Sequence, residues 1–244
     1  MADAALVAGG AGALGQAVVH ELRDRGWDVT VLDRHPHPAD GESGGGDGPT
    51  GRVGGGPAAK AEPYGRVSYV QADLLDPESA GAAVAGVDGL RAVVNLVGGF
   101  AMGPKVGEAE LEEFEFMLRL NLVPAFNLAH AAMPRLAAAG GGAFVCVSAR
   151  AALEPFSGAA GYITAKAGIL ALVRALDAEY HGDGVRANAI LPSVIDTPAN
   201  RDSMPNSDWS KWVPPEQIAQ VIASLCSDDF APTSGAAVPV YGRA

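Results

Sequence analysis

Cysteine is nearly absent from this sequence. Only two of the 244 residues are cysteines, Cys146 and Cys226. Two thiols in a chain of this length do not make a disulfide framework. Cys146 lies in the apolar run Ala143–Val147, where a buried and inert thiol is expected. This cysteine usage favours a reducing, cytoplasmic setting.

Positive charge and long hydrophobic segments are also scarce. The chain has 17 basic and 28 acidic residues, which gives a formal net charge of -11. Such an anionic surface repels phosphate backbones and anionic lipids, so we expect neither nucleic acid nor a membrane as a partner. No window approaches the length of an apolar membrane span, and the N-terminus lacks the basic region and cleavage site of a signal peptide.

Seven short apolar runs recur along the chain, and helical patterns lie between most of them. Near-continuous apolar runs are typical of strands buried on both faces of a parallel sheet. Their alternation with helices predicts an α/β fold, a doubly wound parallel sheet of about seven strands with helices on both faces. The runs are Ala4–Ala8, Val29–Leu32, Val67–Val70, Ala92–Val97, Ala143–Val147, Val185–Ile190 and Ala237–Val240. The helical segments are Ala13–Arg25, Pro77–Ala85, one long helix within Leu111–Ala139, Gly161–Tyr180 and Pro215–Cys226.

One segment breaks this alternation. Gly41–Gly56 holds nine glycines in sixteen residues, together with Pro49. Such a stretch gains little from burial and loses much backbone entropy on ordering. We therefore predict a flexible, glycine-rich surface loop over residues 36–63, inserted within a single domain.

A glycine-rich loop follows the first predicted strand. Gly9, Gly12 and Gly15 recur every three residues. In a dinucleotide site the first glycine permits a tight turn, the second lets pyrophosphate approach, and the third packs helix on strand. The helix that begins near Ala13 would aim free N–H groups at the phosphates. The predicted cofactor contacts here are Gly9, Gly12, Ala13, Leu14 and Gly15.

The end of the second predicted strand bears on the choice of cofactor. Asp33 stands there, eighteen residues after Gly15. A carboxylate at this place accepts hydrogen bonds from both adenosine ribose hydroxyls and repels a 2′-phosphate, so NAD(H) is favoured. Arg34 follows immediately and could accommodate that phosphate, which keeps NADP(H) possible.

Two further strand ends carry candidate contacts. Asp73-Leu74 follows the third strand, at the sheet edge where nucleotides bind. Asn95-Leu96-Val97-Gly98-Gly99 ends the fourth strand, and its glycines would let the backbone approach a ligand closely. A plain strand-to-loop turn is the alternative interpretation of the second segment.

Tyr162 and Lys166 lie four residues apart on a predicted helix and therefore share one face. A free tyrosine has a pKa of about 10, too high for easy proton transfer at neutral pH. A nearby ammonium stabilises the phenolate and lowers that pKa. The pair could then donate or accept a proton beside a hydride carrier.

Together these residues resemble the short-chain dehydrogenase/reductase family over nearly the full length of the chain. The motif Tyr-x-x-x-Lys matches Tyr162 to Lys166, and Asn121-Leu122 matches the active-site asparagine of the family. The resemblance implies one NAD(P)-binding Rossmann domain over residues 1–244. Lys166 would also hold the nicotinamide ribose, and Asn121 would fix a water in a proton relay. The cofactor contacts that it implies are Asp73, Leu74, Asn95, Val97, Gly98, Tyr162, Lys166, Pro192, Ile195 and Thr197, with Thr197 on the carboxamide.

Within the family, the chain is most similar to dihydropteridine reductases. The similarity lies in the glycine loop, in Ala151-Ala152-Leu153 and in the segment from Leu191 to Pro214. The family usually has a serine thirteen residues before the tyrosine, but this position is Ala149 here. Ser148 stands one residue earlier and, by strand alternation, should point away from the site unless the strand end bends. It is retained as a catalytic candidate.

These features predict a reductase that transfers hydride from NAD(P)H to a C=N, quinonoid or C=O group of a small molecule. The alternatives are a ketoreductase of a secondary-metabolite pathway and a catalytically silent, NAD-sensing interaction protein. Apolar positions around Leu120–Ala139 and Ile163–Ala178 suggest a subunit interface, and the family resemblance implies a homodimer or homotetramer built on these helices. Trp209 and Trp212 are candidates for a lid over the substrate. No metal site is expected, since His35 and His37 read as solvated loop residues.

Overall fold

Seven strands form a single parallel sheet in the computed structural model, which describes residues 3–35 and 64–243. The strand order is β3-β2-β1-β4-β5-β6-β7, and every neighbouring pair runs parallel. This confirms the predicted doubly wound sheet. The strands are β1 (Ala4–Ala8), β2 (Asp28–Asp33), β3 (Val67–Gln71), β4 (Leu90–Asn95), β5 (Gly142–Val147), β6 (Val185–Pro192) and β7 (Ala237–Val240). The predicted glycine-rich insertion over 36–63 lies outside the described residues.

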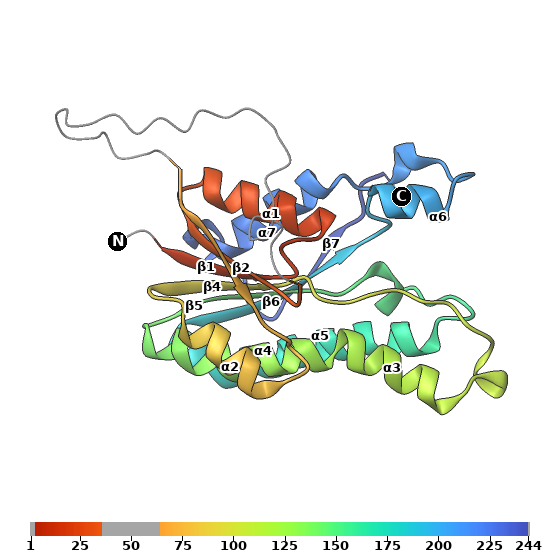
Figure 1. Ribbon diagram of the computed structural model, residues 1–244, viewed down its shortest axis with the longest axis horizontal. Helices are drawn as coiled ribbons and strands as arrows, with labels where there is room; N and C mark the ends of the chain where they lie inside the picture. The colour runs from red at the N-terminus through yellow and green to blue at the C-terminus, as the bar shows by residue number, and fades with distance from the viewer. Residues whose placement is uncertain (1–2, 36–63, 244) are drawn as a thin grey trace.

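Helices cover both faces of the sheet and create two separate cores (Figure 1). One face packs against α1 (Ala13–Asp24) and α7 (Pro215–Cys226). The other face packs against α2 (Pro77–Ala85), α4 (Val123–Ala138) and α5 (Ala160–Tyr180). The central strands β1, β5 and β6 are almost wholly buried, as expected of strands covered on both sides.

The prediction of one long helix over Leu111–Ala139 was wrong. Two helices occupy that stretch, α3 (Leu111–Asn121) and α4, and they meet at Leu122. Pro124 lies at the start of α4 and favours the break there, because proline has no N–H for the helical ladder and suits the first turn of a new helix, although α4 also contains Pro134. A short helix that the sequence did not indicate, α6 (Pro198–Ser203), follows β6.

Three arginines bind the C-terminal ends of helices at the amino edge of the sheet. Arg91 on β4 donates from Nη1 to the carbonyl oxygens of Ala139 and Gly141, at 3.1 and 2.7 Å, just beyond α4. Arg186 on β6 donates to four carbonyl oxygens at and beyond the end of α7, at 2.8 to 3.5 Å. Arg135 donates to two carbonyls at the end of α2. A cation at this place satisfies orphan carbonyls and complements the helix dipole.

Within residues 3–35 and 64–243, every helix is too short or too polar to span a bilayer.

We predict that Arg186→Met lowers the free energy of unfolding by about 3 kcal/mol, because four carbonyl oxygens lose their charged donor in a buried place. Urea denaturation followed by circular dichroism measures this. Arg174→Met, on the exposed face of α5, is the matched control and should change stability by less than about 0.5 kcal/mol. Equal stability of the two variants would show that the bonds of Arg186 add nothing to the fold.

Candidate active site

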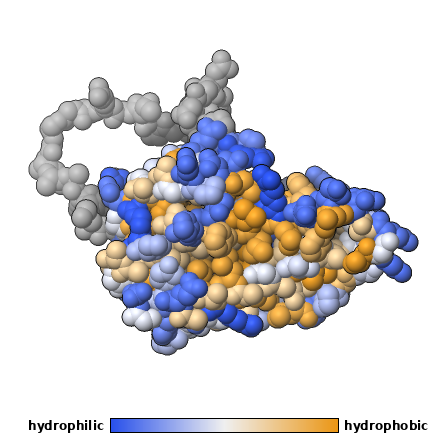
Figure 2. Space-filling view, turned by 90° about the horizontal axis from the view of Figure 1, so that it is seen from below, coloured by the Kyte–Doolittle hydropathy of each residue, from blue (hydrophilic) through white to orange (hydrophobic). Residues whose placement is uncertain are grey.

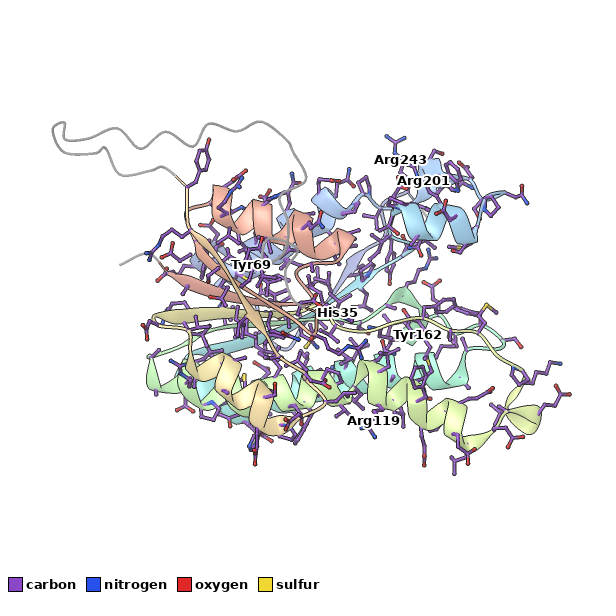
Figure 3. The ribbon with its side chains drawn as sticks, viewed as in Figure 1. His35, Tyr69, Arg119, Tyr162, Arg201 and Arg243 are labelled. Carbon is purple, nitrogen blue, oxygen red and sulfur yellow. The ribbon has the colours of Figure 1, made fainter. Side chains whose placement is uncertain are left out.

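The parallel strands bring the predicted site residues to one edge of the sheet. Gly9 follows β1, Asp33 ends β2, Asn95 ends β4, and Pro192 ends β6. Because all strands point the same way, their carboxyl ends meet at this edge, which is where nucleotides bind in doubly wound folds. Figure 3 shows Tyr162 beyond the same edge.

Tight packing makes glycine necessary at two positions of the loop after β1. Gly9 has a φ of 78°, a conformation that favours glycine. A Cβ atom on Gly15 would lie only 2.3 Å from the carbonyl oxygen of Gly9, so α1 touches the loop through bare backbone. Gly12 differs, since the nearest atom to an added Cβ is 3.5 Å away. The second glycine therefore leaves an open backbone surface.

The N-terminus of α1 faces that open surface. Gly12 is the N-cap residue, and none of the described side chains caps it. Uncapped N–H groups at a helix N-terminus attract anions, and Ala13 and Leu14 supply the first of them. The loop therefore fits the pyrophosphate of a dinucleotide.

Asp33 and Arg34 occupy the end of β2 side by side. Asp33 is partly exposed, and one of its carboxylate oxygens accepts from the backbone N–H of His35 at 3.3 Å. The Arg34 side chain is exposed, while its carbonyl oxygen accepts from Gln71 Nε2 at 3.1 Å. A carboxylate and a guanidinium thus stand beside the place where an adenosine ribose would lie.

The segment after β3 is held in a turn. Asp73 is exposed, and its carboxylate accepts from the N–H of Leu75 at 2.9 Å. Leu74 is buried, and its carbonyl oxygen accepts from Asn127 Nδ2 at 2.8 Å. This leaves Asp73 open to an incoming ligand and Leu74 as packing beneath it.

Gly98 lies against two of the predicted catalytic side chains. A Cβ on Gly98 would be 2.5 Å from Asn121 Oδ1 and 3.2 Å from Lys166 Nζ. Asn121 is fully buried, accepts from the N–H of Gly99 at 3.1 Å, and donates to Met117 O at 3.1 Å. The loop after β4 and helices α3 and α5 therefore converge on one point.

The start of that loop is fixed by Asn95. Its Oδ1 accepts from the N–H of Val97 at 3.2 Å, and the side chain is almost wholly buried. A Cβ on Gly9 would lie 3.3 Å from the backbone nitrogen of Val97, so the two loops are in close contact. Asn95 shapes the turn here, and Val97 lies against the glycine loop.

Lys166 is the most deeply buried cation of the candidate site. It is 6% exposed, and its Nζ donates to Val147 O at 3.0 Å. Burial lowers the pKa of Lys166 to about 8. Its Nζ lies 5.8 Å from the ring centroid of Tyr162, one turn earlier on α5.

Tyr162 does not show the lowered pKa that the sequence led us to expect. Burial raises the pKa of Tyr162 to about 12. The ammonium of Lys166 is bonded to a strand carbonyl and lies over the ring face, so its charge does not offset the desolvation of the phenolate. Tyr162 is therefore a firmly protonated donor.

Ser148 does not offer a free hydrogen to a substrate. Its side chain is buried, and its Oγ donates to the carbonyl oxygen of Lys166 at 2.7 Å. A hydroxyl has one hydrogen to donate, and this one is used within the fold. Ala149, which follows it, has no donor at all. At the two positions where the family usually has a serine and a tyrosine, this chain thus offers one hydroxyl donor, that of Tyr162.

The segment after β6 folds back over this edge. Thr197 caps α6, since its Oγ1 accepts from the N–H of Asn200 at 3.2 Å, and Ile195 O accepts from Asn200 Nδ2 at 2.8 Å. Pro192 is buried at the end of β6. Within residues 3–35 and 64–243 no acceptor bonds the hydroxyl hydrogen of Thr197, so it can serve a ligand.

Contacts between successive side chains stabilise the segment after β6. Arg201 forms a two-contact ion pair with Asp196, and its guanidinium lies 4.9 Å from the ring of Trp209. The rings of Trp209 and Trp212 are 6.3 Å apart. The two tryptophans predicted as lid residues therefore pack together within this segment.

Sequence reasoning missed an aromatic wall beside Tyr162. The ring of Phe100 meets that of Tyr162 edge-on at 5.0 Å, and Phe156 lies 6.3 Å from Phe100. Both phenylalanines come from loops, and no motif or spacing marked them. Tyr162 also lines a cavity of about 660 Å³ with Met102 and Phe114. An apolar, aromatic surface thus borders the proton donor.

Metal ligands are not gathered in the described part of the chain. No three side chains of histidine, cysteine, aspartate or glutamate in residues 3–35 and 64–243 lie close enough together to hold an ion. His35 follows the end of β2, and His37 lies outside the described residues. Both cysteines are free and buried.

Known proteins with similar sequences are dehydrogenases and reductases. A family model described as enoyl-(acyl carrier protein) reductase matches residues 57–242. Cyclohexanol dehydrogenase from Acinetobacter sp. (strain SE19) is 30% identical over 73% of this chain and 74% of its own. Dihydropteridine reductase from Dictyostelium discoideum is 28% identical over 96% of this chain and 92% of its own.

Solved structures share the fold. A short-chain type dehydrogenase/reductase from Mycobacterium ulcerans superposes with a TM-score of 0.83 at 21% identity, covering 99% of this chain and 89% of that chain. Levodione reductase gives a TM-score of 0.82 at 23% identity, covering 98% and 96%. With the family match over most of the chain, these likenesses show that the protein belongs to the short-chain dehydrogenase/reductase family of NAD(P)-dependent oxidoreductases.

Proposed function

We propose that this oxidoreductase uses NADH to reduce an activated small-molecule ring, of the C=N or quinonoid class that includes dihydropterins. The observation that carries the proposal is the lack of a second hydroxyl donor. Ala149 stands where the family usually has serine, and the Ser148 hydrogen is bonded to the carbonyl of Lys166. When bound, the nicotinamide cofactor supplies the hydride, and the chain must supply the proton.

Tyr162 is the proton donor in this proposal. Its raised pKa keeps the hydroxyl protonated across the physiological range, so the hydrogen is always present to be given. Giving it away leaves a phenolate, and the ammonium of Lys166, 5.8 Å from the ring centroid, offsets only part of the cost of that buried charge. Asn121 holds Gly99 and α3 in place through its two hydrogen bonds and so fixes the loop that borders Lys166.

One donor suits an acceptor that is already poor in electrons. A simple ketone concentrates negative charge on its oxygen as hydride arrives, and losing one of two donors costs about 3 kcal/mol of transition-state stabilisation. A quinonoid or iminium acceptor spreads or neutralises that charge. A single proton from Tyr162 then suffices. The aromatic wall of Phe100 and Phe156 offers such a flat ring an apolar surface.

A ketoreductase is the rival function. Cyclohexanol dehydrogenase, among the similar proteins, is named for a simple alcohol. The dihydropteridine reductase is matched over a larger share of both chains at nearly the same identity. We favour reduction of activated rings because this reaction does not need the second hydroxyl donor, which Ala149 lacks.

NADH is the proposed cofactor because of Asp33. Its carboxylate at the end of β2 would accept from ribose hydroxyls and repel a 2′-phosphate. Arg34 is exposed beside Asp33, and its guanidinium would attract the 2′-phosphate of NADP(H). The more buried carboxylate is the better placed of the two, because burial weakens the screening of its charge by water.

The proposed assembly is a homodimer or homotetramer built on α3, α4 and α5. Figure 2 faces this helical layer and shows hydrophobic residues gathered across its middle. Phe116 on α3 is 58% exposed and Phe126 on α4 is 56% exposed, beside a partly exposed Val123. A contiguous exposed apolar surface of this kind marks an interaction site.

The pH dependence of reduction should follow Lys166. As the pH rises through about 8, the ammonium loses its proton, while Tyr162 keeps its own. With NADH as the varied substrate, kcat/KM reports the free enzyme and should fall about tenfold per pH unit above that point. Tyr162→Phe is the control and should bind NADH without turnover at any pH. A flat profile up to pH 10 would contradict the assigned role of Lys166.

Cofactor preference should follow Asp33. The wild type should give a higher kcat/KM with NADH than with NADPH. Asp33→Ala should lower the ratio of these two kcat/KM values about tenfold, because it removes the carboxylate's hydrogen bonds to the ribose of NADH and its repulsion of the 2′-phosphate of NADPH. Arg34→Ala is the matched variant and should widen the ratio. Steady-state kinetics with both cofactors decides it, and a wild-type preference for NADPH would mean that Arg34 dominates.

Self-association should depend on the exposed phenylalanines. Sedimentation velocity at micromolar concentration should show a dimer or tetramer for the wild type. Phe126→Glu should shift it to monomer, because a buried, unpaired carboxylate is costly at an interface. Phe230→Glu, at an exposed phenylalanine after α7, is the control and should leave the assembly intact. A monomeric wild type would refute the interface.

Substrate class should follow Ala149. In NADH oxidation assays the wild type should reduce quinonoid dihydropterin at least about a hundredfold faster than unactivated ketones, since one donor is missing. Ala149→Ser should raise the ketone rate by a larger factor than the dihydropterin rate. Efficient reduction of simple ketones by the wild type would overturn the proposal, because a water or Ser148 would then fill the missing role.

A further inference from the structure

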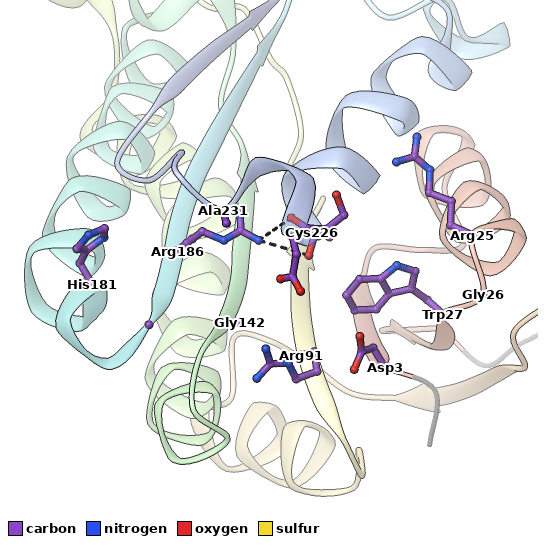
Figure 4. A pocket seen from close by; sticks show the side chains of 13 residues that line it. Asp3, Arg25, Gly26, Trp27, Arg91, Gly142, His181, Arg186, Cys226 and Ala231 are labelled. Atoms are coloured by element: carbon purple, nitrogen blue, oxygen red, sulfur yellow. Dashed lines mark hydrogen bonds between the residues drawn. The ribbon is translucent and has the colours of Figure 1, made fainter.

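A second cavity, of about 480 Å³, lies at the amino edge of the sheet, opposite the candidate active site (Figure 4). Its wall includes Trp27, just before β2, and Gly142 at the start of β5. Arg91 near the start of β4 lines it, while Asn95 at the end of the same strand belongs to the active site. Four residues of strand separate the two by roughly 13 Å. The cavity is therefore distinct from the dinucleotide edge.

Two arginines that line this cavity form no ion pair with any residue that the structure describes. All six hydrogen bonds of Arg91 and Arg186 end on backbone carbonyl oxygens. Neither guanidinium forms a salt bridge with a carboxylate of residues 3–35 or 64–243. Figure 4 shows Arg186 and Arg91 on two sides of the opening, with Trp27 on another.

This arrangement is unusual for a buried charge. Arg186 is 8% exposed, and buried cations are normally paired with an anion. Burial lowers the pKa of Arg186, the carboxylate of Asp228 in the same cavity acts in the opposite sense, and the positive charge of Arg91 adds to the lowering. Two guanidinium groups thus repel each other across one cavity in a chain whose net charge is -11. Asp228 offsets part of the charge of Arg186, and an anion bound at Arg91 would relieve the remaining repulsion.

The remaining charged groups of the cavity narrow the class of ligand. Arg25 is paired with Glu21 at 2.7 Å, and His181 lies 3.3 Å from Asp177, so neither is free for an anion. Asp3 and Asp228 also line the cavity. Two carboxylates require hydrogen-bond donors on the ligand, and hydroxyl groups supply them. The volume lies within the range of small-molecule sites and exceeds what a bare phosphate fills.

We propose that this cavity is a binding site for a phosphorylated sugar or similar hydroxylated phosphate ester. Arg91 uses only its Nη1 for the two carbonyl bonds, so its Nη2 and Nε bind the phosphate in the forked geometry that guanidinium groups favour. The four Nη hydrogens of Arg186 are bonded to carbonyl oxygens, so Arg186 contributes its positive charge and its Nε–H. Asp3 and Asp228 accept from the hydroxyl groups, and Trp27 provides a flat apolar wall. The site is independent of the proposed reductase function and of its substrate.

The test uses the indole N–H signals of the three tryptophans in nitrogen-15-labelled, NADH-loaded protein. Trp27 lines the cavity, whereas Trp209 and Trp212 lie in the segment over the active site. Ribose 5-phosphate and inorganic phosphate are titrated at constant ionic strength. We expect a saturable shift of the Trp27 signal alone, with tighter binding of ribose 5-phosphate because its hydroxyls reach Asp3 and Asp228.

Two variants complete the test. Arg91→Gln should weaken ribose 5-phosphate binding about tenfold, since one charge-assisted contact is lost. Arg174→Gln removes the same charge from an exposed site on α5 and should change the affinity less than about twofold. The proposal is overturned by absence of a saturable shift, by shifts at Trp209 and Trp212 in place of Trp27, or by equal weakening in both variants. Equal affinity for the two probes would overturn the sugar-phosphate class. Should Arg91→Gln fail to fold, the wild-type tryptophan pattern decides.

Discussion

The common direction of the seven strands is the constraint on which this molecule depends. Parallel strands need crossover helices, and each such helix runs back against the strand direction. The carboxyl ends of the strands and the N-termini of helices such as α1 therefore share one edge, and helix C-termini gather at the other. The first edge offers N–H groups and loops to a ligand. The second offers carbonyl oxygens, which three arginines satisfy.

The chemistry of the first edge depends on one close approach. Gly98 leaves room for Asn121 and Lys166, whose polar atoms lie 2.5 and 3.2 Å from where a Cβ atom of that residue would stand. Any side chain there would push the asparagine or the ammonium away. The loop after β4, the end of α3 and the start of α5 hold one another in position. The geometry of the candidate site therefore depends on this packing as well as on the sequence motifs.

The sequence predicted the sheet because strands buried on both faces show as apolar runs, and such runs depend little on distant contacts. It did not predict the end of α3 at Asn121, because Leu122 and Val123 continue the apolar pattern and Pro124 is compatible with a first turn. Strand alternation predicts that Ser148 points away from the open edge, and its hydroxyl is buried and bonded to the carbonyl oxygen of Lys166. The sequence did not predict the position of Phe100 beside Tyr162 or the arginine contacts at the amino edge of the sheet. Loop packing, and contacts between residues far apart in sequence, leave no periodic signal in a sequence.

The buried ammonium of Lys166 has a consequence for how the protein can evolve. Its folded pKa of about 8 lies below the usual 10.5 for lysine, so between these values the unfolded chain holds a proton that the folded chain has lost. The free energy of unfolding therefore rises with pH across that window, and below pH 8 the folded state carries the full penalty, roughly 3 kcal/mol. Selection for thermal stability alone would replace this lysine with an apolar residue. On the proposed role of Lys166, its presence in a core position reflects selection for chemistry over stability.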